Sequence, residues 1–462
     1  MSEVLKKAID KQKKYRFVKE LMIGAYDNSR DSKKKRRLEA NLFVGEWAKL
    51  LGKDGKEAKI KFRGGEGYVP EDSIGEERVL EIYFIDVGQG DAILIQTPDD
   101  KRVLIDGGKD ESAYSFIKWK YRLSEYYKDF EAIIMTHGDE DHSAGLFHLL
   151  EDDHVLVKRI YHNGIAKRKT KPVLGKMKKI DGKNRLTQLY NDIEDLKPFK
   201  NDLTKTYKKW YETGLTVKKR SIEKGIDCKF IRADQNTQPL VIGSENPLKI
   251  TFVNPINLGK KASPELQYFG GVGETLNGNS VAVLVEYGKA KILLCGDMNQ
   301  RAEKLFLEKS NIATPLAQVF KANHHGSQDF ASDFLKIVQP WITVVSSSDD
   351  PDYGHPRAML LGSLGRYAPD YIEKPLLFST EIAATFKPVK EESLKKGNQL
   401  YEKSNHGLIN VRTNGEWLAA GRVYNIRKKE KGKYVKSIYD WEKYAFNLKN
   451  GIPLKDNLKD EL

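Results

Sequence analysis

Short apolar runs, each followed by a polar or glycine-rich turn, recur along the central part of the chain. Long stretches with helical character lie between them, at residues 111–128, 300–309 and 330–338. Apolar runs of this length bounded by turn residues are typical of buried strands. Strands that alternate with helices predict an α+β fold, a sheet-rich sandwich with helices on its outside. The runs cover residues 79–85, 92–96, 102–105, 132–135, 248–254, 280–287, 291–295 and 341–347.

The pattern changes outside this central part and divides the chain into segments. Residues 1–39 are basic and predict a helical N-terminal segment. Residues 40–78 alternate apolar positions with glycine turns, which predicts a small β-barrel-like segment. Its turn at 65–70 resembles the Gly-Tyr-Val turn of bacterial Src-homology-like barrels, so this segment is expected to bind a protein partner. The main domain is expected at 79–425, followed by a basic tail at 426–462.

The bulk composition narrows the class of protein. No apolar run among the 462 residues approaches the roughly 18 that a membrane span needs. The first residues lack the apolar stretch of a signal peptide, and Cys228 and Cys295 lie far apart in the sequence. We therefore expect a cytoplasmic protein without a membrane span. The net charge of +14 favours polyanions as partners.

Most of this positive charge lies in one segment. Residues 167–224 hold 18 Lys or Arg and 7 Asp or Glu, an excess of 11 positive charges, with aromatic residues among them. The segment 165–226 predicts a helical insertion. It is either a lid whose aromatic side chains pack on the main domain, or a basic wall that binds a nucleic-acid backbone and stacks bases. The nucleic-acid contacts that the second interpretation predicts are Lys167, Arg168, Lys169, Lys218, Lys219 and Arg220.

The strongest chemical signal lies directly after the apolar run 132–135. His137, Asp139, Asp141 and His142 place four potential metal ligands within six residues. Histidine together with carboxylate suits zinc, manganese or iron. Further potential ligands also follow predicted strands, which turn formation alone does not explain. These are Asp106, Asp297, His324, His325 and His355.

This set of motifs resembles the metallo-β-lactamase superfamily, and within it the hydrolase domain of ComEC-type DNA-uptake proteins. The matching stretches follow the family's order along the chain. They are 84–91, 104–108, 136–145, 279–280, 293–297, 324–327 and 353–356. The resemblance implies a four-layer αββα sandwich with two divalent metal ions along one edge of its sheets.

The resemblance also implies a role for each ligand. His137 and Asp139 would hold the first metal ion; Asp141, His142 and either His324 or His325 the second; and Asp297 would bridge both. Asp106 would lie beneath the motif and hold ligands in place. Asp139 and Asn279 stand where the superfamily usually has histidine. These oxygen ligands shift the preference from zinc toward manganese or magnesium, so we expect manganese or zinc, with magnesium as the alternative.

These residues predict a metal-dependent phosphodiester hydrolase, in which a metal-activated water attacks phosphorus. Asp141, Asp106 and His355 are expected to act in catalysis, with His355 as a phosphate contact and Lys321 and Ser327 as further candidates. A nuclease acting on DNA, rather than RNA, is the leading hypothesis. One alternative is a hydrolase of a small phosphoester or phospholipid headgroup. Another is a non-catalytic scaffold with a structural metal site. The remaining histidines, His162 among them, are expected to be structural.

Overall fold

The chain forms two compact units. The computed structural model describes residues 15–32, 34–310, 316–348, 354–373, 375–381, 387–388, 401–402, 407–430 and 433–454. The first unit comprises residues 1–82, 97–99 and 407–462, and the second comprises residues 83–96 and 100–406. Strand β8 (Leu80–Phe84) runs from the first unit into the second.

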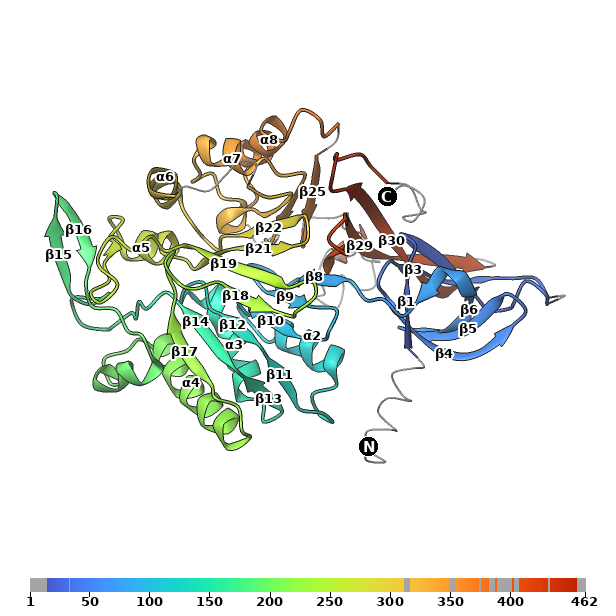
Figure 1. The fold of residues 1–462 in the computed structure, drawn as a ribbon, viewed down its shortest axis with the longest axis horizontal. Coiled ribbons are helices and arrows are strands. Elements are labelled where there is room, and N and C mark those ends of the chain that lie inside the picture. The colour runs from blue at the N-terminus through green and yellow to red at the C-terminus, as the bar shows by residue number, and fades with distance from the viewer. Residues whose placement is uncertain are drawn as a thin grey trace. The chain divides into compact units, whose positions relative to one another are not determined.

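The first unit consists of strands from both ends of the chain. Neighbouring strands in the sheet follow the order β28-β29-β30-β3-β2-β6-β5-β4-β1-β7, drawn in blue and red in Figure 1. Ile23, Ala58, Ile60 and Val69 are in its core. The strands are β1 (Tyr15–Val18), β2 (Met22–Tyr26), β3 (Leu38–Phe43), β4 (Trp47–Asp54), β5 (Glu57–Phe62), β6 (Gly65–Pro70), β7 (Ile74–Gly75), β28 (Ile409–Thr413), β29 (Trp417–Glu430) and β30 (Lys433–Asn447).

Two sequence predictions about this unit are wrong. Residues 15–39 form strands rather than a helix, because β1 pairs with β4 and β2 pairs with β3. The expected tail at 426–462 is largely the hairpin of β29 and β30, which pair antiparallel along their length. Pairing of this kind joins residues far apart in sequence and overrides the local signal of a charged stretch. Residues 1–14 and 455–462 lie outside the described part of the chain.

The segment 40–78 is not a barrel on its own. It shares its sheet with β1 and β2 before it, and Ala40 of β3 pairs with Tyr439 of β30. The ring of Phe43 stacks on Trp441, with 4.7 Å between the ring centroids. The N- and C-terminal segments therefore form one unit, although nearly 330 residues separate them in the chain.

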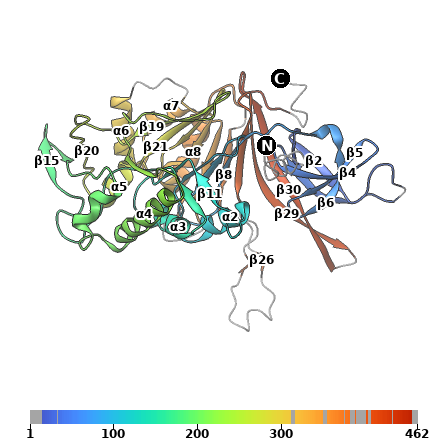
Figure 2. The ribbon, with the colours of Figure 1, turned by 60° about the horizontal axis from the view of Figure 1, so that its bottom comes forward.

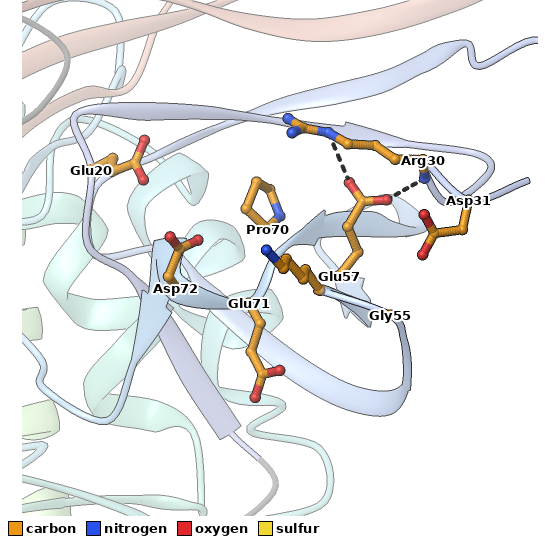
Figure 3. A pocket seen from close by; sticks show the side chains of 9 residues that line it. Glu20, Arg30, Asp31, Gly55, Glu57, Pro70, Glu71 and Asp72 are labelled. Carbon is orange, nitrogen blue, oxygen red and sulfur yellow. Dashed lines mark hydrogen bonds and ion pairs between the residues drawn. The ribbon is translucent and has the colours of Figure 1, made fainter.

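A hollow of about 1030 Å³ opens in the first unit (Figure 3). Glu57 is held at its edge by Arg30, whose backbone N–H donates to Oε2 over 2.5 Å. Five carboxylates against two cations line the hollow, so its net charge repels a polyanion. The charged lining residues are Glu20, Arg30, Asp31, Lys56, Glu57, Glu71 and Asp72.

The second unit has mixed α and β structure in several sheets, as the sequence predicts at that level. One sheet has the order β17-β14-β12-β10-β9, in which β9 and β10 are antiparallel and the remaining pairs are parallel. Its strands are fully apolar at the centre, as expected for parallel strands that are covered on both faces. They are β9 (Ile93–Gln96), β10 (Arg102–Ile105), β12 (Ala132–Ile134), β14 (Arg159–His162) and β17 (Lys229–Arg232).

The other large sheet has seven strands in the order β18-β19-β21-β22-β23-β24-β25. Its second half is parallel, from β22 to β25. The carboxyl ends of these parallel strands therefore lie at one edge of the sheet. The strands are β18 (Leu240–Ile242), β19 (Leu248–Asn254), β21 (Ala282–Tyr287), β22 (Ala290–Leu294), β23 (Val319–Lys321), β24 (Ile342–Val345) and β25 (Leu376–Ser379).

Helices accompany both sheets. α2, α3 and α4 lie on the side of the β9–β17 sheet and α6, α7 and α8 on the side of the seven-stranded sheet (Figure 1), and α3 and α4 lie side by side in both views (Figure 2). Among the described residues, no helix is both long and apolar enough to span a bilayer. The helices are α2 (Ser112–Tyr121), α3 (Glu140–Glu151), α4 (Lys205–Glu223), α5 (Val272–Gly278), α6 (Gln300–Lys309), α7 (Ser332–Val338) and α8 (Ala358–Arg366).

The basic insertion is helical only in part. Its first half contains the hairpin of β15 (Met177–Ile180) and β16 (Lys183–Leu186), to which β20 (Leu266–Gln267) adds a third strand. A 3₁₀ segment (Ile193–Phe199) and then α4 follow. Short elements complete the unit: β11 (Lys128–Phe130), β13 (Val155–Val157), β26 (Lys387–Pro388), β27 (Tyr401–Glu402) and a 3₁₀ turn (Asn323–Gly326).

Candidate metal centre

A buried cluster of histidines and carboxylates lies where strands of both sheets end. His142 follows β12 and lies in the first turn of α3, Asp297 follows β22, and His325 lies in the 3₁₀ turn after β23. The side chains of His142, Asp297 and His325 are at most 4% exposed. Four groups in this region, Asp91, His142, Asp297 and His325, offer ligand atoms within 4.8 Å of one another. The cluster has the donor types and the burial of a divalent metal site.

Asp106 fixes the orientation of His142. Its Oδ2 lies 2.8 Å from His142 Nδ1, and the same carboxylate accepts the backbone N–H and the hydroxyl of Thr136. A carboxylate at Nδ1 selects the tautomer in which Nδ1 carries the proton and Nε2 is a free lone pair. Asp106 thereby holds both Thr136 and His142 in place.

His325 is held in the same way by a backbone carbonyl. Its Nδ1 donates to Ser346 O over 2.9 Å, which leaves Nε2 to face the cluster. The two Nε2 atoms of His142 and His325 are 3.2 Å apart. His324, by contrast, has a side chain that is 30% exposed, and its Nε2 lies 3.8 Å from Asp297. Of the two neighbouring histidines, His325 is therefore the one inside the cluster.

Four ligand atoms face a common centre. His142 Nε2 lies 3.2 Å from Asp297 Oδ2 and 4.0 Å from Asp141 Oδ2. His325 Nε2 lies 3.3 Å and 3.2 Å from the same two oxygens. Tetrahedral ligands about 2.1 Å from an ion are roughly 3.4 Å apart. The separations of 3.2–3.3 Å are close to this value, whereas the 4.0 Å between His142 Nε2 and Asp141 Oδ2 is longer.

The charges of this cluster demand a cation. Burial favours neutral imidazole, but Asp297, Asp141 and Asp106 together raise the pKa of His142 well above its ordinary value. Burial likewise opposes ionisation of Asp297, yet His142, His325 and His324 hold the pKa of Asp297 well below its usual range. The carboxylates therefore favour positive charge at the imidazoles, and a divalent ion held there would supply that charge.

Asp91 and Lys321 form a buried ion pair behind the histidines. Lys321 Nζ lies 2.5 Å from Asp91 Oδ2, and both side chains are at most 2% exposed. Asp91 approaches the Nδ1 atoms, at 3.9 Å for His142 and 3.6 Å for His325. Because Asp106 and Ser346 occupy those Nδ1 atoms, Asp91 supports the histidines and does not share their open side with Asp141 and Asp297.

Sequence reasoning gave Asp91 no role, although it lies in a stretch that matches the family. Two features of the sequence point to it. Lysine inside the apolar strand β23 requires a buried counter-charge, and Asp91 follows the glycine turn 88–90. Gly90 has φ +131°, and a Cβ at this position would collide with the backbone oxygen of Asp141. The turn therefore packs directly on the metal-binding motif.

His137 and Asp139 lie on the other side of Asp141. His137 Nε2 is 3.7 Å from Asp139 Oδ2, and it is buried without a hydrogen-bond partner among the described residues. Burial and His142 lower the pKa of His137 to about 4, and burial and Asp141 raise the pKa of Asp139 to about 6. Asp297 Oδ1 is a second buried acceptor without a hydrogen-bond partner in the described chain. Unpaired atoms of this kind fit a second ion.

Asn279 does not take the place of a ligand histidine. Its amide nitrogen donates to Gln267 O and Thr275 O, over 2.9 Å and 2.8 Å, and so fixes the turn before β21. His355 lies beside His324, with 5.8 Å between the ring centroids. Burial and His324 lower the pKa of His355 to about 4.

The aromatic residues of the insertion are packed inside the second unit. Trp210 and Tyr207 on α4 are 1% and 2% exposed, and Trp210 Nε1 donates to the hydroxyl of Tyr190 over 3.2 Å. The hydroxyl of Tyr207 packs against Gly138 of the metal-binding motif. These rings cannot stack on bases, so the lid interpretation is correct for them.

Most of the predicted nucleic-acid contacts already have partners within the protein. Arg220 is buried and donates to Val155 O and Leu150 O, so its prediction is wrong. Lys218 is bound between Asp192 and Glu194, and the guanidinium of Arg168 lies 3.8 Å from the ring centroid of Phe199. Lys169 donates to Asn201 O. The side chain of Lys219 is 80% exposed. Lys167 lies near enough to Asp139 to lower the pKa of that carboxyl group.

Comparison with known proteins agrees with this geometry. Residues 85–213, which include Asp91, Asp106 and the whole 137–142 motif, match the family described as the metallo-beta-lactamase superfamily. The match lies almost entirely within the second unit and covers the strands and loops that carry these residues. ComE operon protein 3 of Bacillus subtilis (strain 168) is 23% identical over 307 residues, which are 62% of this chain and 31% of that protein. The matched region thus spans about a third of that relative.

Two solved structures match the chain at low similarity. A protein of Parabacteroides distasonis ATCC 8503, proposed to be a metal-dependent hydrolase, has 11% identity and a TM-score of 0.30, covering 70% of this chain and 97% of that one. The flavodiiron protein of Giardia intestinalis has 14% identity and a TM-score of 0.21, covering 47% and 38%.

Proposed function

We propose that the second unit is a metal-dependent phosphodiester hydrolase that acts as a nuclease on DNA, with the four-layer sandwich of its superfamily. The observation that carries the proposal is that the Nε2 atoms of His142 and His325 each lie 3.2–4.0 Å from the other Nε2 and from the same two carboxylate oxygens. His142, His325, Asp141 and Asp297 would hold one ion. His137 and Asp139, with Asp297 between the two positions, would hold the other.

The ligand types support manganese or zinc as the cofactor. His142 and His325 give the first group two nitrogens, which suits either ion. The position of Asp139 contributes oxygen where a zinc enzyme of this family has nitrogen, which favours manganese for the second ion. When bound, such ions make water more acidic and offset the charge on phosphoryl oxygens.

The chain's own residues prepare this chemistry. Asp106 and the Ser346 carbonyl keep the two Nε2 lone pairs directed at the centre. The buried Lys321 balances Asp91, so that the carboxylates beneath the histidines do not add a surplus negative charge. His355, whose ring centroid lies 5.8 Å from that of His324, would contact the phosphate at its leaving-group side.

DNA is the proposed substrate for two reasons. The matching motifs resemble those of ComEC-type DNA-uptake hydrolases, and the chain carries a net charge of +14. A polyanionic substrate releases counterions when it binds such a surface, whereas a small phosphoester gains little from it.

The test is cleavage of single- and double-stranded DNA by metal-stripped protein after addition of manganese, magnesium or zinc. We expect activity only with added metal and a loss of more than roughly 100-fold in His142→Ala and His325→Ala, since even residues behind the ligands cost 10- to 100-fold. His148→Ala, which removes an exposed histidine of α3 in the same way, is the matched control and should retain full activity. DNA cleavage that persists in both histidine variants would rule out this site as the nuclease centre.

A further inference from the structure

A second pocket, of about 560 Å³, lies between the β15–β16 hairpin, β20 and α6. Arg301, Lys304, Leu305 and Glu308 form one face of α6 and line one wall. Lys183 and Asn184 of the hairpin form the opposite wall, and Gln267, Tyr268, Phe269 and Gly270 form the rest.

The pocket is positively charged. It has three cations, Lys183, Arg301 and Lys304, against Glu308, whose charge is already offset by Lys309 at 2.8 Å. Neither Lys183 nor Lys304 forms an ion pair within the described part of the chain. Arg301 already has a partner in the protein, because its Nη1 donates to Phe269 O over 2.5 Å. Lys304 Nζ donates to the neutral Gln300 Oε1 over 3.4 Å, so the charges of both exposed lysines can meet an anion.

The same pocket has an apolar and amide-rich side. Tyr268 and Leu305 are half-buried, and Phe269 is buried. The amide of Gln267 spans the wall by donating to Asn184 O and Tyr268 O, over 3.1 Å and 2.9 Å. Cations next to an apolar surface of this size suit a nucleotide, whose phosphate is anionic and whose base is flat.

The walls of the pocket connect to the metal centre through short hydrogen-bonded paths. α6 begins three residues after Asp297, and Asn299 caps it by accepting the N–H of Ala302 over 3.1 Å. On the other wall, Gln267 O accepts from the amide of Asn279, and Asn277, two residues earlier, lies 3.4 Å from His324. Both walls of the pocket are therefore connected to the metal-binding loops through a few residues.

We infer that this pocket anchors a single-stranded segment of the nucleic-acid substrate next to the scissile phosphodiester, with Lys183 and Lys304 on the backbone phosphates. The inference rests on the proposed function, because it names where that substrate binds. It also places the binding surface on the hairpin and α6 rather than on the basic face of α4.

The test compares two double charge reversals in the full chain. Binding of fluorescein-labelled dT12 is measured by anisotropy with EDTA over a series of salt concentrations. Lys183→Glu/Lys304→Glu should weaken binding at least about tenfold and lower the salt slope by about 1.4, the value for two lost contacts to a single strand. Lys208→Glu/Lys219→Glu on α4 makes the same charge change and should bind like wild type. The neutral pair Lys183→Gln/Lys304→Gln should show the same change in slope.

Each outcome decides the matter. Equal dT12 affinity in wild type and the pocket variants would overturn the pocket while leaving the nuclease proposal in place. Equal losses of dT12 affinity in the pocket and α4 variants would mean that only net charge matters, which would also overturn the pocket. Pocket variants that lose binding to anionic lipid vesicles but not to dT12 would overturn it as well. If wild type hydrolyses no DNA with any metal but dT12 binding still depends on Lys183 and Lys304, the pocket stands and the proposed activity fails.

Discussion

At the scale of single residues, the candidate centre depends on which nitrogen of each histidine is occupied. His142 and His325 both have Nδ1 tied to an oxygen of the protein, and both present Nε2 to Asp141 and Asp297. The sequence showed the donor types and their spacing along the chain. It could not choose between His324 and His325, because that choice depends on the left-handed backbone of both residues, with φ of 47° and 53°.

Asp106→Asn should weaken metal binding by about 10- to 100-fold, measured by calorimetry with manganese. An amide nitrogen facing His142 Nδ1 would push the proton onto Nε2, the atom that must bind the ion. Asp110→Asn makes the same change on an exposed residue of the following loop, and its affinity should equal that of wild type. An unchanged affinity in Asp106→Asn would show that the tautomer of His142 is set by other means.

Lys321→Met should lower the free energy of unfolding by about 3–5 kcal/mol, because it leaves the charge of Asp91 buried and unpaired. Removing both charges in Lys321→Met/Asp91→Leu should cost less than Lys321→Met alone. Urea unfolding of wild type, both single variants and the double variant gives the coupling energy directly. Additive losses would mean that the two side chains do not form the pair described.

His162 makes stability depend on pH. It is buried, accepts the N–H of Gly164 and donates to Asn191 O, and burial lowers its pKa to about 3. Below pH 6.5 the unfolded chain takes up a proton that the folded chain cannot. The contribution of neutral His162 to the free energy of unfolding is therefore fully present above pH 6.5. It is lost at about 1.4 kcal/mol per pH unit as the pH falls toward 3. His162→Phe keeps a ring beside Tyr190 and should unfold with less dependence on pH. Parallel pH curves for the two proteins would contradict this account.

At the scale of elements, the strand ends were predictable and the pairing partners were not. The apolar runs before Asp106, His137 and Asp297 are strands β10, β12 and β22, because buried strands carry a continuous local signal. The hairpin of β29 and β30 was mistaken for a tail because its sequence is mostly charged, and its strands are specified by pairing with each other. Whether the aromatic side chains of α4 pack inside the domain or stack on bases likewise depends on tertiary structure, and Tyr207 and Trp210 are buried.

The contact of α4 with the metal motif predicts an effect of Gly138→Ala. The added methyl group would collide with the ring of Tyr207, so either the motif loop or α4 must shift. We expect weaker manganese binding, measured by calorimetry, and partial recovery in Gly138→Ala/Tyr207→Ala, where the obstructing ring is removed. No recovery in the double variant would indicate that Gly138 matters for another reason, such as the backbone conformation of the loop.

At the scale of the whole molecule, the distribution of charge matters more than its sum. The charged residues of the hollow in the first unit are mainly carboxylates, whereas those of the pocket at α6 are three cations and one carboxylate. Within the insertion, much of the positive charge that the sequence shows is already bound, as Lys218 and Arg220 illustrate. The net charge of +14 therefore predicted a polyanion as partner but not the surface that receives it.

The most direct test of the central claim is DNA cleavage by Asp297→Asn, measured beside wild type with manganese at saturating concentration. Asp297 is the carboxylate that lies within 3.3 Å of both His142 Nε2 and His325 Nε2. Asparagine keeps the volume of the side chain and removes its charge. The structure predicts manganese-dependent cleavage by wild type and a loss of more than roughly 100-fold in the variant. Cleavage at the wild-type rate by Asp297→Asn would contradict a metal-dependent nuclease centre at this cluster.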